Sequence, residues 1–181
     1  GNIGAGCGAT VGKLYGMGQS TKAGLGLHCI QIGSFQIGAI VVVNAAGDIY
    51  EAGTGKRLAG LLSADRKQPL DSVAEMCKCL VPHDQFTGNT TIGAVFTNAA
   101  FSKAELNKIA SMTRNAYARS ISPVGTMADG DSIYAVSIGS EKVDINVAGT
   151  LAASVMQEAI RKAVESARIP EEEFVAAVQN L

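Results

Sequence analysis

The sequence predicts a single domain of the α/β or α+β class. Residues 34–44 and 90–98 are apolar, rich in β-branched side chains and free of charge, which is typical of buried strands. From residue 90 onward the expected elements alternate as strand, helix, strand and helix, with no repeat of fixed period. A length of 181 residues fits one domain with a hydrophobic core, so we treat residues 1–181 as a single unit.

The first half contains few regular elements. Residues 1–26 are interrupted by glycines and predict no clear helix or strand. Residues 34–44 form a strand that ends in an Asn-Ala-Ala-Gly turn, and residues 48–51 are expected to pair back on it as a short strand. The polar, proline-containing stretch 53–88 predicts a solvated, mobile connection with one brief helix at about 71–80.

The second half returns to regular structure. After the strand at 90–98, Ser102 and Glu105 form a capping box, which predicts a helix that runs to about Arg119. The remaining elements are a strand that faces two environments, a long alanine-rich helix and a short final helix, expected at residues 132–138, 144–167 and 171–179.

Composition narrows the classes of function. A net charge of -1 disfavours nucleic acid or a polybasic membrane contact as partner. No apolar run reaches the roughly 18 residues that cross a bilayer, and nothing resembles a secretory leader. The 4 cysteines lack the spacing of a disulfide framework, so we expect reduced thiols and a cytoplasmic location. With 21 glycines and no tryptophan, the core must consist of small aliphatic side chains.

Two motifs resemble a phosphate-binding loop and a zinc site, but the residues at key positions disfavour both. Gly12-Lys13 resembles the end of a phosphate-binding loop, but Cys7 stands where the first glycine belongs and Leu14 replaces the hydroxyl residue. Further along the chain, Cys77, Cys79, His83 and Asp84 are residues of the types that bind zinc. No second pair of cysteines or histidines lies downstream, so two helix cysteines beside a loop histidine is the preferred interpretation.

The junction Asn89-Thr90 joins the polar connection directly to a buried strand. One interpretation is a loop that ends in a β-favouring threonine. The other is an N-terminal nucleophile, in which the Thr90 hydroxyl attacks the Asn89 carbonyl and water cleaves the resulting ester. The freed α-amine, with an unperturbed pKa of about 8, would then serve as the base for that hydroxyl.

Three further polar residues follow the same pattern of two interpretations. Asp129 and Asp131 flank a glycine just before a strand, where they form either an ordinary Asp-Gly turn or a pair that orients a nucleophile or holds a substrate ammonium. Asn44 ends a buried strand, where its amide either caps the turn or donates to an oxyanion.

Four segments together resemble the self-processing L-aminopeptidase/D-esterase (DmpA-like) family, which includes the β-peptidyl aminopeptidases and an endo-acting nylon-oligomer hydrolase. These segments, in chain order, are GNIGAGCGATVGK, VVVNAAGD, NTTIGAVFTNA and MADGDSIYAVS. The resemblance implies an α-β-β-α sandwich of the DmpA/ornithine acetyltransferase type. It also implies one precursor that cleaves itself before a serine or threonine.

The resemblance assigns roles to individual residues. It implies cleavage between Asn89 and Thr90, which makes residues 1–89 the end of a large subunit and residues 90–181 the small subunit. Thr90 matches the nucleophile, and Asn89 matches the residue before the cut. The other matching positions are the asparagine that polarises the carbonyl, the lysine of the nylon-oligomer branch and the acidic pair of that branch: Asn44, Lys13, Asp129 and Asp131.

The resemblance also implies partners. Family precursors carry a long stretch before the glycine-rich segment, so we expect the sandwich to be incomplete at the N-terminus of this chain and the missing segment to be a partner. The expected substrate is a small peptide or related amide, hydrolysed without metal or cofactor by a homo-oligomer. Alternatives are an acyltransferase of the ornithine acetyltransferase type and a structural or binding relative that never cleaves itself.

Overall fold

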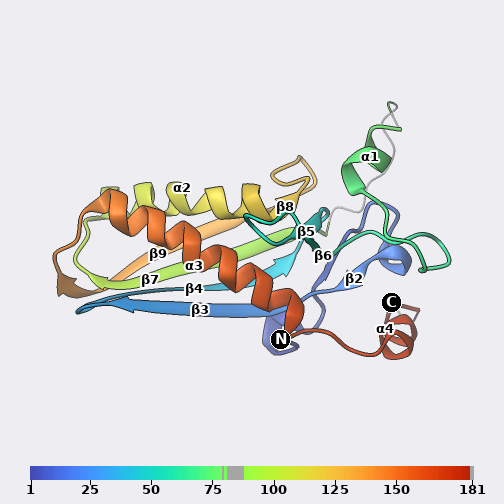
Figure 1. The fold of residues 1–181 in the computed structure, drawn as a ribbon, viewed down its shortest axis with the longest axis horizontal. Coiled ribbons are helices and arrows are strands. Elements are labelled where there is room, and N and C mark those ends of the chain that lie inside the picture. Colours follow the sequence, from blue (N-terminus) through green and yellow to red (C-terminus); the bar gives the residue numbers. More distant parts are fainter. Residues whose placement is uncertain (79, 81–87, 180–181) are drawn as a thin grey trace.

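A four-stranded sheet with helices on one face forms the body of the protein. The computed structural model describes residues 1–78, 80 and 88–179. The sheet has the order β3-β4-β7-β9, with β7 and β9 parallel and the other pairs antiparallel. Figure 1 shows two long helices, α2 and α3, running along the same side of these strands. The bounds of these elements are β3 Leu25–Ile32, β4 Phe35–Asn44, β7 Thr90–Ala99, β9 Ser132–Glu141, α2 Lys103–Ser120 and α3 Ile145–Glu165.

The core lies between this sheet and the two helices. Alternate residues of β4 and β7 point into it, as the period of a strand requires. Small aliphatic side chains fill the space between the layers, as the composition predicted. On β4 the core residues are Ile37, Ala39, Val41 and Val43, and on α3 they include Ala152, Met156, Ala159 and Ala163.

The opposite face of the sheet is open and apolar. Leu27, Ile40 and Tyr134 lie in one row across it, because Leu27 pairs with Ile40, and Ala94 joins Ile40 to Tyr134. A contiguous exposed apolar surface of this kind is typical of an interaction or ligand-binding site. The exposed large hydrophobic side chains of this face are Leu27, Ile40, Ile92, Tyr134, Val136 and Ile138.

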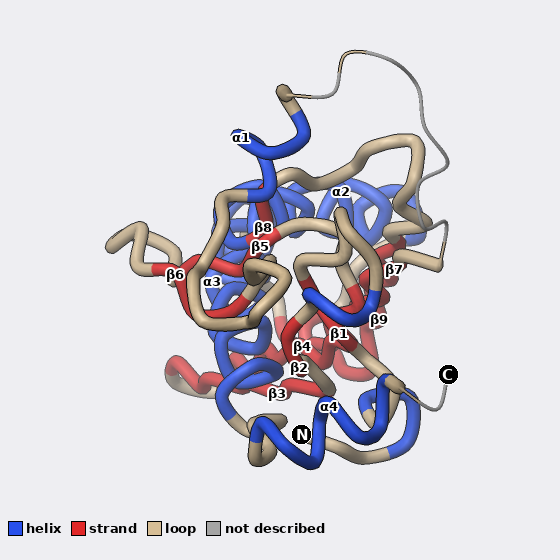
Figure 2. The backbone as a smooth tube through the Cα atoms, turned by 90° about the vertical axis from the view of Figure 1, so that its right-hand side faces the viewer, coloured by secondary structure: helices blue, strands red, loops and turns tan. Residues whose placement is uncertain are grey.

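Smaller elements gather at one end of the main sheet. A two-stranded sheet pairs β1 (Thr10–Val11) with β2 (Thr21–Lys22), and a three-stranded sheet has the order β6-β5-β8. The strands of the latter are β6 Arg57–Ala59, β5 Asp48–Tyr50 and β8 Ile121–Ser122, and short 3-10 turns cover Gly4–Gly6 and Met17–Gln19. Figure 1 shows β5, β6 and β8 at one end of the main sheet, and in the end-on view of Figure 2 β8 and β5 lie nearer the short helix α1 (Ser72–Met76) than β1 and β2 do. The last helix, α4, covers Glu171–Val178.

Most expected elements are confirmed, one main strand was missed and two expectations need correction. The capping box is present, since Ser102 accepts from the Glu105 amide and the Glu105 carboxylate accepts from the Ser102 amide. Strand β3, in contrast, was not expected. Strand β5 pairs with β6 and β8 rather than back onto β4. The connection expected to be mobile is anchored along residues 57–72, where Leu61 and Ser72 are buried.

The expected fold class of the sandwich is confirmed. The protein is a mixed α/β fold in which one helical layer and one main sheet are built from the described residues. Within that same part of the chain, no helix is long and apolar enough to span a bilayer.

Candidate active site

Thr90 and Asn44 lie side by side at one end of the main sheet. They are the terminal residues of β7 and β4 and are direct partners in the antiparallel register. Because side chains alternate along a strand, both share the open face with Ile40 and Ile92. The two polar side chains therefore stand at the edge of the uncovered apolar surface.

The peptide bond before Thr90 is surrounded by donors. The Thr90 hydroxyl donates to the carbonyl oxygen of Asn89, with 2.5 Å between the oxygens. The backbone N–H of Gly130 donates to that same carbonyl oxygen at 2.9 Å. Asn89 itself is buried. The Asn89–Thr90 peptide bond thus has the Thr90 hydroxyl oxygen beside it as a nucleophile. The Gly130 N–H is in place to stabilise the negative charge of a tetrahedral intermediate.

Gly130 is a residue whose role the sequence analysis missed. A Cβ atom at this position would lie 2.8 Å from the Thr90 Oγ, closer than real Cβ contacts come. Its backbone has no positive φ, so space near the hydroxyl, and not strain, favours glycine. The signal in the sequence was the glycine between two aspartates, but both interpretations of that motif, a turn or an acidic pair at the site, gave the glycine itself no catalytic part.

Lys13 and Asn44 form a second polar pair at the site. The Lys13 ammonium donates to the Asn44 side-chain oxygen at 2.7 Å and to its backbone carbonyl at 3.2 Å. The backbone amide of Thr10 donates to the same side-chain oxygen at 3.2 Å. The Asn44 amide group donates to the Gly88 carbonyl at 2.9 Å, one residue before the carbonyl that the expected role requires.

Burial makes Lys13 an unusual cation. Its side chain is almost wholly enclosed. Desolvation lowers the pKa of Lys13 to about 8, and the nearby charge of Asp129 opposes this shift. The ammonium form is therefore held close to its titration point at neutral to mildly alkaline pH.

The two aspartates take different positions. Asp131 accepts a 2.8 Å hydrogen bond from the amide of Thr91, the residue after the nucleophile candidate. Burial is the main cause that raises the pKa of Asp131 above its ordinary value. Asp129 instead accepts from the amide and hydroxyl of Thr126, at 3.0 and 2.7 Å. Asp129 thus closes the loop that carries the Gly130 amide to Asn89.

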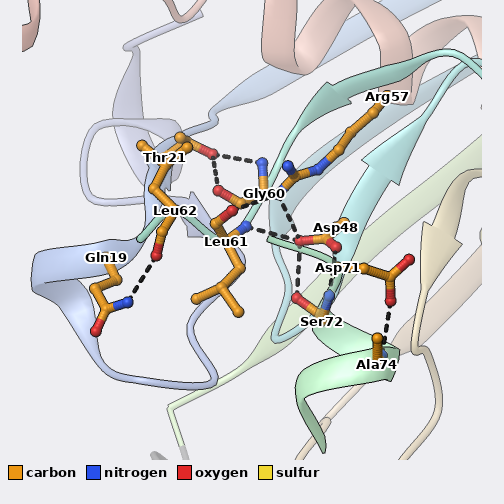
Figure 3. Close-up of polar contacts among 10 residues, drawn as sticks. All are labelled: Gln19, Thr21, Asp48, Arg57, Gly60, Leu61, Leu62, Asp71, Ser72 and Ala74. Carbon is orange, nitrogen blue, oxygen red and sulfur yellow. Dashed lines mark hydrogen bonds and ion pairs between the residues drawn. The ribbon is translucent and has the colours of Figure 1, made fainter. Parts of the chain in front are cut away.

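Asp48 holds the surroundings of the site together (Figure 3). Its buried carboxylate accepts from the Leu61 amide at 2.7 Å, from the Ser72 hydroxyl and amide at 2.8 Å each, and from Arg57 at 3.2 Å. These bonds join β5, the 60–61 segment and the first residue of α1. Nothing in the sequence singles out Asp48, because an Asp after a glycine has the same pattern as an ordinary turn.

A small cavity adjoins the Asn89–Thr90 bond. Its volume is about 20 Å³, close to that of one water molecule. Apolar atoms of the loops and of α1 make up much of its wall. The lining residues are Lys13, Leu14, Ala46, Ser72, Met76, Asn89, Pro123 and Thr126.

The two disfavoured motifs have different outcomes. The amides of Gly12 and Lys13, which a phosphate loop would offer to its ligand, donate to the carbonyls of Gly47 and Ala46. Gly12, at φ +71°, packs directly against the Gly60–Leu61 backbone. Of the metal-ligand candidates, Cys79, His83 and Asp84 lie outside the described residues, and the described ones contain no group of three His, Cys, Asp or Glu side chains suited to a metal.

Comparisons with known proteins agree on one family. A family model described as peptidase family S58 matches residues 1–173. A 6-aminohexanoate-oligomer endohydrolase of Agromyces sp. (strain KY5R) is 33% identical over 90% of this chain and 50% of its own length. An uncharacterized aminopeptidase of Mycobacterium leprae is 34% identical over 77% of this chain and 37% of its own length.

Solved structures share the fold. The L-aminopeptidase D-Ala-esterase/amidase of Ochrobactrum anthropi, described as a variant of the Ntn hydrolase fold, matches 99% of this chain and 52% of its own, with a TM-score of 0.62 and 18% identity. A beta-aminopeptidase of Burkholderia sp. matches with a TM-score of 0.54, 18% identity and coverage of 99% and 53%. The chain thus spans about half the length of the relatives it matches.

Proposed function

This chain belongs to peptidase family S58, and from that premise and the geometry around Thr90 we propose that it is part of a self-cleaving N-terminal-nucleophile amidohydrolase. The proposed activity is hydrolysis of the N-terminal amide bond of small peptides or related amides. The observation that carries this proposal is the pair of donors, the Thr90 hydroxyl and the Gly130 amide, on the Asn89 carbonyl oxygen.

Self-cleavage would proceed by transfer of the Asn89 acyl group from nitrogen to oxygen. The Thr90 Oγ attacks the Asn89 carbonyl carbon, and the Gly130 amide stabilises the oxyanion. The C–N bond then breaks, and the proton from the hydroxyl ends on the new α-amine of Thr90. Water hydrolyses the ester, which leaves Asn89 as a carboxylate and restores the Thr90 hydroxyl.

Turnover would use the same hydroxyl with a new base. The free α-amine of Thr90 accepts the hydroxyl proton as Oγ attacks the substrate carbonyl and later gives it to the departing amine. Water then releases the acyl group from Oγ. An amine with a pKa near 8 is suited to this exchange at neutral pH, and the Thr90 α-amine becomes available only after cleavage.

The polar neighbours would support both reactions. Lys13 places a positive charge beside Asn44, and departure of the Gly88 segment frees the Asn44 amide for the oxyanion of a substrate. Asp131 already contacts the Thr91 amide, so its carboxylate is close enough to orient the ammonium form of the Thr90 amine or of a substrate. Asp129 keeps Gly130 in place through Thr126.

We assign the open face of the main sheet to the segment that precedes Gly1 in the precursor. The supporting observations are the row of exposed Leu27, Ile40 and Tyr134 side chains and the half-length match to the relatives. Since Thr90 and Asn44 share this face, the covering segment would also complete the substrate site. Deleting the segment would then expose the apolar row and promote association of the chain. If a partner in trans or a second copy of this chain covered the face instead, the deletion would leave the oligomeric state unchanged.

The proposed compartment is the cytoplasm. Cys7, Cys29 and Cys77 are free and exposed. Exposed thiols of this kind persist in a reducing compartment.

An assay on the full-length protein tests the proposed reaction. Aminoacyl p-nitroanilides should be hydrolysed by the wild type and not by Thr90→Ala. Adding a second amine in excess separates the two enzyme classes, because an acyltransferase would give the amide of that amine in preference to the free acid. Predominant transfer to the amine, or activity retained without the Thr90 hydroxyl, would overturn the proposal.

A further inference from the structure

In the uncut chain, Asn89 is the acyl residue of the bond next to Thr90. Attack by the Thr90 Oγ would break the Asn89–Thr90 C–N bond and leave Asn89 esterified to that oxygen. Attack on a substrate would break the substrate's C–N bond, release its amine and leave its first residue esterified to the same oxygen. The two esters differ only in the acyl group. In this comparison Asn89 corresponds to a substrate's first residue.

The space around Asn89 limits how large the first residue of a substrate can be. Asn89 is 3% exposed and forms part of the wall of the 20 Å³ cavity. Replacing Asn89 by another acyl group leaves the volume of one asparagine side chain together with room for about one water. Leu14, Met76 and Pro123 supply apolar walls, and Lys13 makes the polar side of the cavity positive.

Met76 belongs to a wall that is firmly attached. It lies four residues after Ser72 in α1, so the two side chains share one face of the helix, and both line the cavity. Ser72 is fixed through its amide and hydroxyl to the buried Asp48 carboxylate. The position of Met76 is thereby tied to the loop cluster that supports the site.

We propose that the side chain of the substrate's N-terminal residue binds where the Asn89 side chain lies, and that Met76 sets its permitted size. The inference rests on the function proposed above. The substrate class is an amide whose first residue bears a small side chain that is not cationic, because the space is small and Lys13 disfavours a second positive charge.

The test compares substrates that differ only in that side chain. With the cleaved full-length enzyme, kcat/KM is measured for the p-nitroanilides of alanine, asparagine, leucine and phenylalanine. The wild type should prefer alanine and asparagine. Met76→Ala should raise the ratio of leucine to alanine about tenfold or more, since a few methylenes in an apolar pocket have effects of this size.

Matched variants show whether the effect belongs to the pocket. Met127 is fully exposed in the loop after Pro123, so Met127→Ala should leave the ratio unchanged. Leu14→Ala opens the same cavity from another segment and should move the ratio in the same direction as Met76→Ala. If Met76→Ala fails to fold, Leu14→Ala still tests whether this cavity sets the size of the side chain.

Self-cleavage gives an independent measure of the same pocket. Asn89→Leu should slow cleavage of the wild-type precursor about tenfold or more and should slow the Met76→Ala precursor less. If Met76→Ala changes this dependence but not the substrate ratio, residue 89 and the substrate use different pockets and the inference is wrong. A wild type that neither cleaves itself nor hydrolyses amides would instead refute the proposed function.

Discussion

The backbone N–H of Gly130 donates a 2.9 Å hydrogen bond to the carbonyl oxygen of Asn89. The Thr90 hydroxyl donates to the same oxygen. The loop that contains both aspartates therefore supplies a second donor at the peptide bond proposed to break. The order Asp-Gly-Asp then has a physical reason. Asp129 closes the loop, Gly130 leaves space for the hydroxyl, and Asp131 contacts the amide of Thr91.

Gly130→Ala should slow self-cleavage by about 10²-fold, the cost that a displacement of a reacting group by about 1 Å can have. The added Cβ would stand 2.8 Å from the Thr90 Oγ and displace the hydroxyl from the carbonyl. The measurement is a time course of precursor loss on denaturing gels. Gly8→Ala is the control, since nothing lies within 4 Å of a Cβ at that exposed position. Equal rates for both variants would contradict the role of Gly130.

Lys13→Met should slow self-cleavage most at low pH. The pKa of Lys13 is about 8, so its charge assists an oxyanion below this pH and is lost above it. The ratio of the wild-type to the variant rate should therefore be large at pH 6–7 and fall toward one as pH rises through about 8. Lys108→Met, at an exposed lysine of α2, should keep a flat ratio near one.

The same shift predicts how stability depends on pH. The pKa of Lys13 is lower in the folded chain than its ordinary 10.5, so between about 8 and 10.5 the unfolded chain binds more protons. The Lys13 contribution to stability should thus increase with pH across this range. Urea unfolding of the wild type and of Lys13→Met at several pH values measures it, and parallel curves would contradict the burial of a charged Lys13.

Asp131→Asn should move the acid limb of turnover to lower pH. The carboxylate favours the protonated form of the nearby Thr90 α-amine, so its removal should lower the pKa of that amine. The profile of kcat/KM against pH measures the limb. Glu172→Gln, at an exposed acid of α4, is the control. An acid limb that stays in place would mean that Asp131 acts only on the Thr91 amide.

Asp48→Ala should reduce the free energy of unfolding by about 3–5 kcal/mol, because a buried charge pair is broken and buried N–H groups lose their acceptor. These groups are the amides of Leu61 and Ser72. Urea unfolding measures the loss, with Asp65→Ala as the exposed control. A midpoint as high as that of the control would show that the 57–72 segment is held by other contacts.

The sequence predicted those elements whose signals are local. Strand β7 and helix α2 follow from an uncharged β-branched run and from the Ser102–Glu105 capping box, which need no distant partner. Strand β3 has glycine and histidine within it and is fixed by pairing with β4, which a local pattern does not show. The pairing of β5 with β8 joins residues far apart in the chain, so proximity in sequence gave the wrong partner.

The candidate site shows the same division. Thr90, Asn44, Lys13 and the two aspartates were named from side-chain chemistry and resemblance, and the fold brings them to one end of the sheet. The contribution of Gly130 is a backbone amide, which no side-chain pattern reveals. Asp48 acts through bonds to three separate segments, and only the folded chain brings these segments together.

The central claim, that Thr90 becomes a terminal nucleophile, is tested most directly by amino-terminal sequencing and intact mass of the purified full-length protein. The wild type should yield a fragment that begins Thr90-Thr91-Ile92, and Thr90→Ala should remain one uncut chain without amidase activity. Thr90→Ser, which keeps a hydroxyl, should still be cut. Cleavage of Thr90→Ala at this junction, or a wild type that stays intact yet hydrolyses amides, would contradict the account.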